Sequence, residues 1–451
     1  MKLHRFVSFC TLIAAGFSLG VGQRSPDFQR HEGRPESQTP VFVEARTFIS
    51  SVAGKSRLAI LYRIPERFFV AVHNPSGTQS ARLVLRPEIS VEILDKGGSA
   101  VARDLRRDDV GTTEDTTETP DRRFLEGGFQ FDISPGEYSL VFEVNDRESS
   151  RHYVDNKRKV SVRDFSKSPL ALTDILFLQP ELENAPPAAV NYGGDLPLGR
   201  NAECYVEART RATQDSFSLS YNLYREQPGN RLPLQARSIS APPGFSAMLS
   251  LEKGGQDLLT WKKILPAGVQ PFHFSIRTDT LPEGEYVLEL IAARGHDTVR
   301  KTEMFQVRWF DKPFTLRNLE RAIDALRYIA GEDELGNMRH ANADAQRRLF
   351  DDFWKKRDTM PATAYNKVMA EYYRRADHAA MHFGTLRNAD GIETDRGKAY
   401  LLYGPPTRVS RQMKPSVPPR EVWEYDSLKK RLIFVDENHR GEYVLLTTED
   451  R

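Results

Sequence analysis

The chain has 451 residues, with 64 lysine and arginine side chains against 62 aspartate and glutamate side chains, and 39% of its residues are hydrophobic. This near-neutral balance lacks the basic excess of nucleic-acid-binding domains, and 28% charged residues is typical of soluble domains. At about 100 to 200 residues per domain, the length predicts roughly three domains.

The N-terminus has the order of a secretory signal peptide. Lys2 and Arg5 precede an uncharged apolar stretch over residues 6–17, and small residues follow at 20–22. The stretch is shorter than the roughly 20 residues that a membrane-spanning helix needs. We therefore expect residues 1–22 to be a cleaved signal peptide, with an uncleaved anchor as the alternative. No other transmembrane segment is expected, and the mature protein would be exported to the periplasm or the extracellular space.

The cysteine content excludes an internal disulfide in the mature chain. Cys10 lies within the apolar stretch of the signal peptide, so that Cys204 remains alone after cleavage. Cys204 lies in the run AECYVEART, with no histidine nearby in the sequence. We expect it to be a small buried residue in a strand rather than a nucleophile.

A polar tail over residues 23–39, predicted to be disordered, precedes a region of short runs rich in β-branched and aromatic residues. Such runs, bounded by turn residues and often alternating in polarity, predict antiparallel strands. The polar segment between Arg106 and Arg123 predicts an exposed loop. The predicted strands lie at 41–49, 58–64, 67–74, 90–96, 129–133 and 137–144.

A weak internal repeat divides this region into two modules. The segment ISPGEYSLVFEV at 133–144 recurs as LPEGEYVLELIA at 281–292, and a charged turn and a further strand follow each copy. Proline and glycine would form the corner before a strand, and the hydroxyl of Tyr138 or Tyr286 would bond back to that corner, as in immunoglobulin-like sandwiches. We therefore predict two immunoglobulin-like β-sandwich modules. They would span residues 40–166 and 167–312.

The apolar pattern takes a helical period from Pro313 onward. Three helices are predicted, over about 316–330, 341–357 and 365–383, and Thr315 can cap the start of the first. Short apolar runs then predict strands at 398–403, 421–425, 431–436 and 442–446, and the last two would form a hairpin. The fold class is therefore multidomain and mainly β, with two sandwich modules followed by an α+β domain at 313–451. That domain would contain three helices and a small antiparallel sheet.

Several segments of this last domain resemble a known family when they are taken together in order. They are FWKKRD (353–358), EYYRRADHAAMHF (371–383), GIETDRGKAYLLYGPP (391–406), VWEY (422–425) and LIFVDE (432–437). This set resembles the GWxTD domain family, with Ile392 at the position of the signature tryptophan. The resemblance implies no particular reaction, because the family has no agreed biochemical activity.

The segment that begins at Gly391 supplies most of the candidate binding residues. Thr394 and Asp395 can cap or turn the backbone, Arg396 can pair with a carboxylate, and Gly397 permits a backbone conformation closed to other residues. Both a rigid structural turn and a surface that faces a ligand or partner fit these properties. A phosphate loop does not fit, because a strand is predicted after the turn. The candidate binding residues are Thr394, Asp395, Arg396, Gly397, Tyr403, Gly404, Pro405, Trp423 and Tyr425.

The sequence contains no recognisable catalytic set. His378 and His382 have the i, i+4 spacing of metal ligands, but HAAMH lacks the glutamate of HExxH. The neighbouring Arg374 and Arg375 oppose a divalent cation, so we predict a solvated helix face, no metal and no cofactor. An acid/base pair for hydrolysis would have to come from carboxylates of the last domain. These are Glu393, Asp395, Glu421 and Glu424.

The favoured hypothesis is an exported, non-enzymatic binding or scaffolding protein of the cell envelope. Its partner would be another envelope protein or a cell-surface polymer, and not nucleic acid. The alternatives are a hydrolase of an envelope polymer that uses Asp395 with a nearby glutamate, and a structural stalk or secretion cargo.

Overall fold

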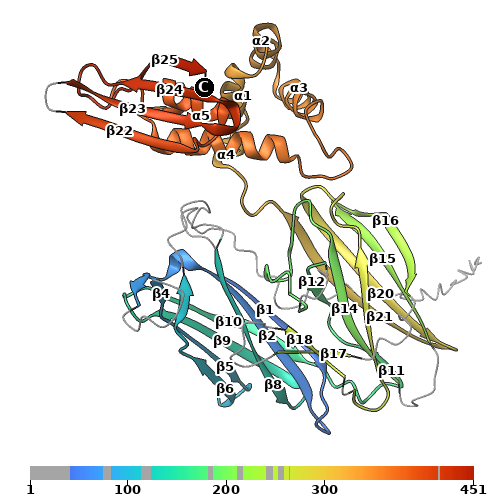
Figure 1. The fold of residues 1–451 in the computed structure, drawn as a ribbon. Helices are drawn as coiled ribbons and strands as arrows, with labels where there is room; N and C mark the ends of the chain where they lie inside the picture. The colour runs from blue at the N-terminus through green and yellow to red at the C-terminus, as the bar shows by residue number, and fades with distance from the viewer. Residues whose placement is uncertain are drawn as a thin grey trace, which may run out of the picture.

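The computed structural model is mainly β, with several sheets and, in the residues that it describes, five α-helices (Figure 1). No helix within this described part is long and apolar enough to cross a membrane. The expected signal peptide, the polar tail and most of the loop expected between Arg106 and Arg123 lie outside the described residues. The described residues are 41–74, 83–112, 123–180, 186–210, 217–239, 247–251, 259–263, 265–414 and 417–450.

The first module consists of two antiparallel sheets around one core, with strand orders β1-β2-β8 and β10-β9-β5-β6. Alternate residues of a strand point to opposite faces, so that Ile60, Val91 and Phe142 meet between the sheets. A small sheet of β3, β4 and β7 adjoins them. The elements are β1 (Phe42–Ile49), β2 (Ser56–Pro65), η1 (Glu66–Phe68), β3 (Val72–His73), β4 (Leu83–Leu85), β5 (Pro87–Leu94), β6 (Ala100–Arg106), β7 (Val110–Thr112), β8 (Phe124–Ile133), β9 (Gly136–Asp146) and β10 (His152–Val162).

The second module also has two main sheets. In one sheet β14 pairs with β11, β12 and β19, and the other has the order β13-β21-β20-β15-β16. Cys204 is buried in β14, as predicted. The strands are β11 (Leu170–Leu172), β12 (Leu176–Leu178), β13 (Leu196–Pro197), β14 (Ala202–Thr210), β15 (Ser218–Gln227), β16 (Asn230–Ile239), β17 (Met248–Leu251), β18 (Leu259–Lys262), β19 (Val269–Ile276), β20 (Gly284–Arg294) and β21 (Asp297–Arg308).

The repeat found in the sequence is also present in the topology. The order β21-β20-β15-β16 of the second module reproduces the order β10-β9-β5-β6 of the first. The Tyr138 hydroxyl donates to the carbonyl oxygen of Ser134 at 2.8 Å, and the Tyr286 hydroxyl donates to that of Pro282 at 2.7 Å. The predicted bond from each tyrosine back to its corner is therefore confirmed.

The two modules share a buried interface. β1 is buried along its whole length, whereas a strand with one solvated face would expose alternate residues. Val43 and Ala45 face the core of the first module. Phe48, on the other face of β1, belongs to an apolar cluster with Leu176 and Tyr205 of the second module. In Figure 1 the two modules accordingly lie side by side.

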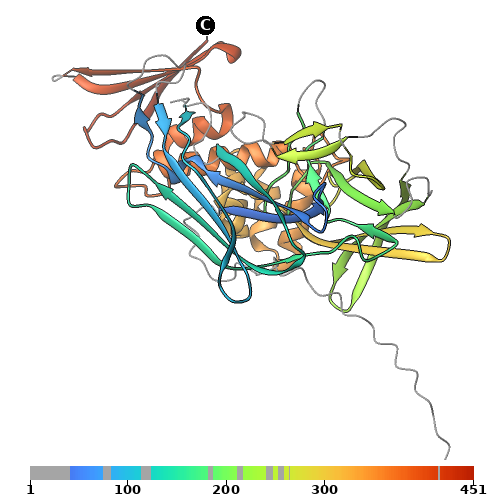
Figure 2. The same cartoon turned by 90° about the horizontal axis from the view of Figure 1, so that it is seen from below.

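The C-terminal domain packs its helices against an antiparallel sheet of order β22-β23-β24-β25, with one core between them. Figures 1 and 2 show its helices over the junction between the two modules. The predicted hairpin of the last two strands is confirmed. The elements are η3 (Phe314–Arg317), α1 (Leu319–Ala325), η4 (Leu326–Tyr328), α2 (Glu332–His340), α3 (Ala343–Lys355), α4 (Lys367–His382), η5 (Gly391–Glu393), α5 (Asp395–Tyr403), β22 (Arg408–Lys414), β23 (Val417–Tyr425), η6 (Asp426–Leu428), β24 (Lys430–Val435) and β25 (Val444–Asp450).

Four local predictions were wrong. The strand predicted at 398–403 is helix α5. Of the residues predicted as a strand at 67–74, only Val72 and His73 form one, β3, and η1 ends at Phe68. The described part of the domain has five α-helices instead of three, because the sequence pattern missed the polar α2 and took the apolar run of α5 for a strand. Thr315 does not cap the first helix. Its hydroxyl donates to Asp377 at 2.6 Å, and Asn318 caps α1.

Candidate functional site

The predicted motif forms a tight turn between α4 and α5. The Thr394 hydroxyl donates to the Gly391 carbonyl at 2.8 Å and accepts from the Gly397 amide at 3.0 Å, so that Thr394 caps α5 as predicted. A Cβ added to Gly397 would lie 1.9 Å from the Gly391 oxygen. The special backbone conformation predicted at Gly397 is absent, since this residue is in the ordinary helical region. Close packing is what requires glycine there.

Asp395 joins the start of α5 to the last strand of the sheet. Its Oδ2 atom accepts a hydrogen bond from the backbone amide of Leu445 at 2.7 Å. A carboxylate in the first turn of a helix also interacts favourably with the helix dipole. Both interactions of the Asp395 carboxylate are with backbone groups of the same domain.

Arg396 lies between the helices and the sheet. Its guanidinium carbon is 4.5 Å from the centroid of the Tyr443 ring, and its Nη1 atom is 3.6 Å from Glu421 Oε2. Burial lowers the pKa of Arg396, and the nearby Glu421 opposes that shift. Glu421 Oε1 also accepts from the indole nitrogen of Trp423 at 2.6 Å. The predicted pairing of Arg396 with a carboxylate is therefore present.

The remaining candidates lie where α5 ends and against the sheet. Gly404, with a φ of 78°, ends α5, and its carbonyl accepts from the Tyr425 hydroxyl at 3.2 Å. The ring of Tyr403 packs against that of Tyr425, with 5.7 Å between their centroids. Trp423 is buried in the core, whereas Pro405 is exposed. The structure therefore brings these residues together mostly in the interior of the domain.

Residues 293–446 match the family model described as the GWxTD domain. The C-terminal region of the chain is a GWxTD domain. No curated protein matches the chain. Similar solved structures include a Parabacteroides merdae β-glucuronidase (TM-score 0.20, 10% identity, 58% of this chain and 28% of that chain) and Escherichia coli alpha-2-macroglobulin activated by porcine elastase (TM-score 0.16, 12% identity, 59% of this chain and 23% of that chain). The chain spans less than a third of the length of either protein.

Within the GWxTD domain, Ile392 occupies the position of the signature tryptophan and is buried in the core. Its backbone carbonyl accepts a hydrogen bond from the Tyr328 hydroxyl at 3.0 Å. An apolar side chain at this position therefore anchors the motif against the helical layer.

The other carboxylates of the GWxTD domain that were candidates for acid/base chemistry have ion-pair partners. Glu393 lies 2.6 Å from Arg327, and Glu424 lies 3.5 Å from Arg408. Glu421, described above, also lies 3.2 Å from Arg411. No group of three or more histidine, cysteine, aspartate or glutamate residues within the described ranges could hold a metal ion.

The two histidines of the HAAMH segment differ in their surroundings. The His378 ring stacks between His382 and Tyr400, with centroid distances of 4.2 and 4.3 Å. Burial, together with the charge of His382, lowers the pKa of His378 to about 4. The solvated face that the sequence predicted is therefore present at the exposed His382 and wrong for the half-buried His378.

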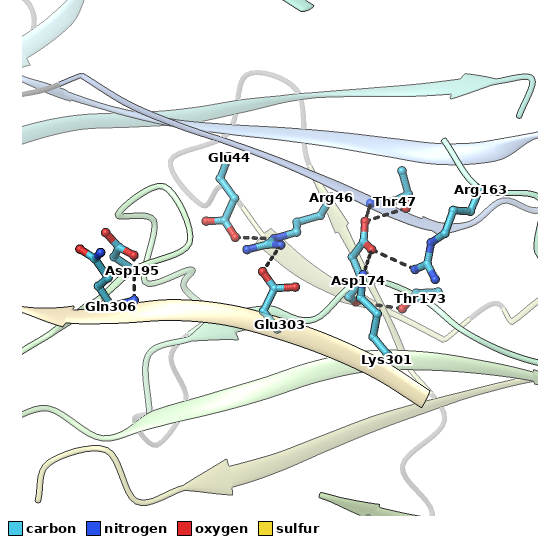
Figure 3. A network of polar contacts seen from close by, with 10 residues as sticks. All are labelled: Glu44, Arg46, Thr47, Arg163, Thr173, Asp174, Asp195, Lys301, Glu303 and Gln306. Carbon is cyan, nitrogen blue, oxygen red and sulfur yellow. Dashed lines mark hydrogen bonds and ion pairs between the residues drawn. The ribbon is translucent and has the colours of Figure 1, made fainter. Parts of the chain in front are cut away.

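A second cluster, which the sequence did not reveal, lies between the two β modules (Figure 3). Arg46 on β1 pairs with Glu44 at 2.6 Å and with Glu303 on β21 at 2.7 Å, and at most 6% of each side chain is exposed. Burial alone would lower the pKa of Arg46, but the two carboxylates outweigh it and raise the pKa. We call Glu44, Arg46 and Glu303 the buried triad.

Asp174 forms the second part of this cluster. It accepts from the Thr47 amide at 2.7 Å and lies 2.7 Å from Lys301 and 2.9 Å from Arg163. Burial alone would raise the pKa of Asp174, but Lys301, Arg163 and Arg46 hold it well below its usual range. Asp174 of the second module therefore accepts from the backbone of the first module and pairs with one cation of each module, Arg163 of the first and Lys301 of the second.

Glu207 of β14 completes the interface. It pairs with Arg57 of β2 and accepts from the Ile49 amide at 2.8 Å. Burial raises the pKa of Glu207, although Arg57 opposes that shift. The ion pairs described so far thus join four cations to four anions. They are Arg46, Arg57, Arg163 and Lys301, and Glu44, Asp174, Glu207 and Glu303.

An aromatic cluster lies where the two modules meet the segment that leads to the GWxTD domain. Phe310 stacks on Tyr192 with 4.2 Å between centroids, and Phe42 of β1 packs edge-on against both rings. Farther along, Tyr365 packs against Trp309, and the Ala364 amide donates to the Asp279 carbonyl at 2.8 Å. These contacts connect the GWxTD domain to the β modules.

Proposed function

We propose that this is an exported, non-enzymatic binding or scaffolding protein of the cell envelope. Its two β modules would hold the GWxTD domain in a fixed orientation toward another envelope protein or a cell-surface polymer. The observation that carries the proposal is the buried, ion-paired interface between the modules, because such an interface favours one arrangement of the two modules over flexibly linked ones.

We further propose that both modules are immunoglobulin-like sandwiches. The support is their common sheet order and the tyrosine at the start of β9 and β20, whose hydroxyl bonds to the backbone four residues upstream. A tyrosine in this position is typical of immunoglobulin-like domains. Modules of this kind are widespread in cell-surface proteins, which agrees with the expected export.

The contacts of the GWxTD motif support a non-enzymatic role. A general acid or base must reach a substrate proton with its carboxyl group. Asp395 instead accepts a backbone amide, and Glu393, Glu421 and Glu424 lie within ion-pair distance of arginines. The alternative of a polymer hydrolase that uses Asp395 gains no support from these contacts.

Photo-cross-linking in the native cells tests the proposal. A photoreactive amino acid is placed at exposed positions of the GWxTD domain, Met381 and Leu386, and at the exposed Val101 and Leu232 of the β modules as controls. We expect a discrete cross-linked product from the domain positions and none from the controls. The absence of a product from all four positions would contradict the proposal, as would polymer hydrolysis by the purified protein that is lost in a folded Asp395→Asn variant.

Two further measurements address export and the stalk alternative. N-terminal sequencing of the protein from an envelope or extracellular fraction is expected to begin between residues 21 and 23. Deletion of the chain from Pro313 onward is expected to give the same phenotype as deletion of the whole gene. Cells that instead behave like those with the full-length protein would favour the stalk or cargo alternative.

A further inference from the structure

β22 is an edge strand of the GWxTD domain. It pairs with β23 on one side, and all seven of its residues are exposed. The outer side of an edge strand presents backbone N–H and C=O groups that can pair with an added strand. β22 therefore has the geometry needed for strand addition.

The charges of β22 are all of one sign. Arg408, Arg411 and Lys414 lie on it, and it has no acidic residue. Arg411 and Arg396 both lie within 4 Å of the same oxygen of Glu421, at 3.2 and 3.6 Å. Arg408 lies 3.5 Å from Glu424 and 3.7 Å from Asp426, so the positive charge of this edge is greatest around Arg411 and Lys414.

Two apolar side chains of β22 are also exposed, and one of them, Val409, shares its face of the sheet with Arg411. Val409 is 45% exposed and Met413 is 70% exposed. Val409 is the direct partner of Trp423 across the strand pair, so both side chains lie on the same face of the sheet. The large exposed hydrophobic side chains of the described residues are all aliphatic, and sugar rings are usually bound on aromatic faces. This edge therefore suits a peptide better than a polysaccharide.

We infer that β22 binds an extended acidic segment of another protein as an additional antiparallel strand. Backbone hydrogen bonds would provide affinity, and alternate side chains of the segment would meet the apolar and cationic residues of β22. The same cations oppose the pairing of two β22 edges, because like charges would lie opposite each other. This inference rests on the proposed binding function and names the partner chemistry and the surface.

A labelled octapeptide of alternating valine and glutamate is the probe. The mature full-length protein is titrated into the peptide, and binding is followed by the fluorescence anisotropy of the peptide. The titration is done at about 0.05 M and about 0.5 M salt, because salt screens the attraction between charges much more strongly at the higher concentration. We expect saturable binding that weakens at least about tenfold at high salt and in the Lys414→Glu variant. Lys367→Glu, an equal charge change at an exposed position at the start of α4, is expected to leave binding unchanged.

Hydrogen–deuterium exchange identifies the mode of binding. The peptide is expected to slow amide exchange in β22, because the added strand covers its outer N–H groups. Equal binding of a valine–lysine peptide, binding without protection of β22, or no binding would overturn the inference. Salt-sensitive self-association of the protein that is lost in Lys414→Glu would also overturn it, since the added strand would then come from a second copy.

Failure of this inference can be separated from failure of the proposed function. The photo-cross-linking experiment is repeated with the Lys414→Glu variant. If the peptide does not bind but the cross-linked product persists unchanged, the role of β22 is refuted and the proposed binding function is not. Loss of the product in Lys414→Glu but not in Lys367→Glu supports both.

Discussion

Replacement of Arg46 by methionine tests whether the buried triad holds the two β modules together. Methionine keeps much of the length of the arginine stem but removes its charge and hydrogen-bond donors. Glu44 and Glu303, which are only 4% and 5% exposed, would then keep their charges without the guanidinium between them. Water cannot easily replace that partner at such burial.

The structure gives the size of the expected effect. Removal of one partner of a buried ion pair costs about 3–5 kcal/mol, because the other charge remains buried and uncompensated. Arg46 has two such partners, so we expect Arg46→Met to lie at the upper end of that range. The triple variant Glu44→Gln/Arg46→Met/Glu303→Gln removes all the charges of the triad. We expect it to regain most of the loss and to lie within about 2 kcal/mol of the native protein, since buried ion pairs contribute little net stability.

Urea unfolding at neutral pH measures these differences, and hydrogen–deuterium exchange in β1 and β21 localises them to the interface. Arg103→Met is the matched control. Arg103 forms an ion pair with Glu92 at 3.2 Å but is 67% exposed, so its loss should cost less than about 1 kcal/mol. The reasoning fails if Arg46→Met costs no more than Arg103→Met, or if the triple variant is as unstable as the single one.

Asp195, two glycines and His378 give further predictions. Asp195 accepts from the Gln306 amide at 3.0 Å (Figure 3) and lies 3.5 Å from Arg308. Burial nevertheless raises the pKa of Asp195 to about 6 from 3.8, so its charge opposes folding above pH 6 and this penalty disappears below about pH 4. Asp195→Asn should therefore stabilise the protein at pH 7 by up to about 3 kcal/mol and flatten the pH profile of thermal unfolding. Gly397→Ala should destabilise the GWxTD domain by about 2 kcal/mol or more in urea unfolding, whereas Gly336→Ala, which has open space in α2, should stabilise it by about 0.5–1 kcal/mol. His378 should titrate near pH 4 by NMR, and Tyr400→Ala, which removes a stacked ring, should move that midpoint toward 6.5.

The sequence predicted those features that depend on local chemistry. The corner tyrosines, Tyr138 and Tyr286, were assigned from a proline–glycine corner followed by a strand, and both hydrogen bonds are present. The hairpin of β24 and β25 followed from two apolar runs joined by a polar turn. In such cases the residues within a dozen positions determine the structure.

Helix α5 shows where local patterns become ambiguous. Its sequence KAYLLY is a short apolar run, and such a run fits a buried strand as well as a buried helix. The cap at Thr394 and the positive φ of Gly404 fix both ends of a helix. Both were visible in the sequence as turn residues, but the period of a six-residue run could not choose between the two structures.

Local sequence patterns could not predict the interface between the modules, for a different reason. In β1, Glu44 and Arg46 alternate with apolar residues, and this alternation predicts a polar face that meets water. The pattern shows which face is polar but not what covers it. Here Glu303 and Asp174, far away in the sequence, supply the partners that allow these charges to be buried.

The placement of the motif changes where function should be sought in the GWxTD domain. Thr394, Asp395 and Gly397 connect α4, α5 and β25, and each makes contacts inside the domain that account for its residue type. A signature made of such residues marks the fold of the domain and does not by itself mark a site of chemistry. Residues that act on a partner must instead reach the surface, and on this domain the β22 edge combines exposure, unpaired backbone and a single sign of charge. Substitutions in the motif should therefore reduce stability and partner binding together, whereas Lys414→Glu should reduce binding alone.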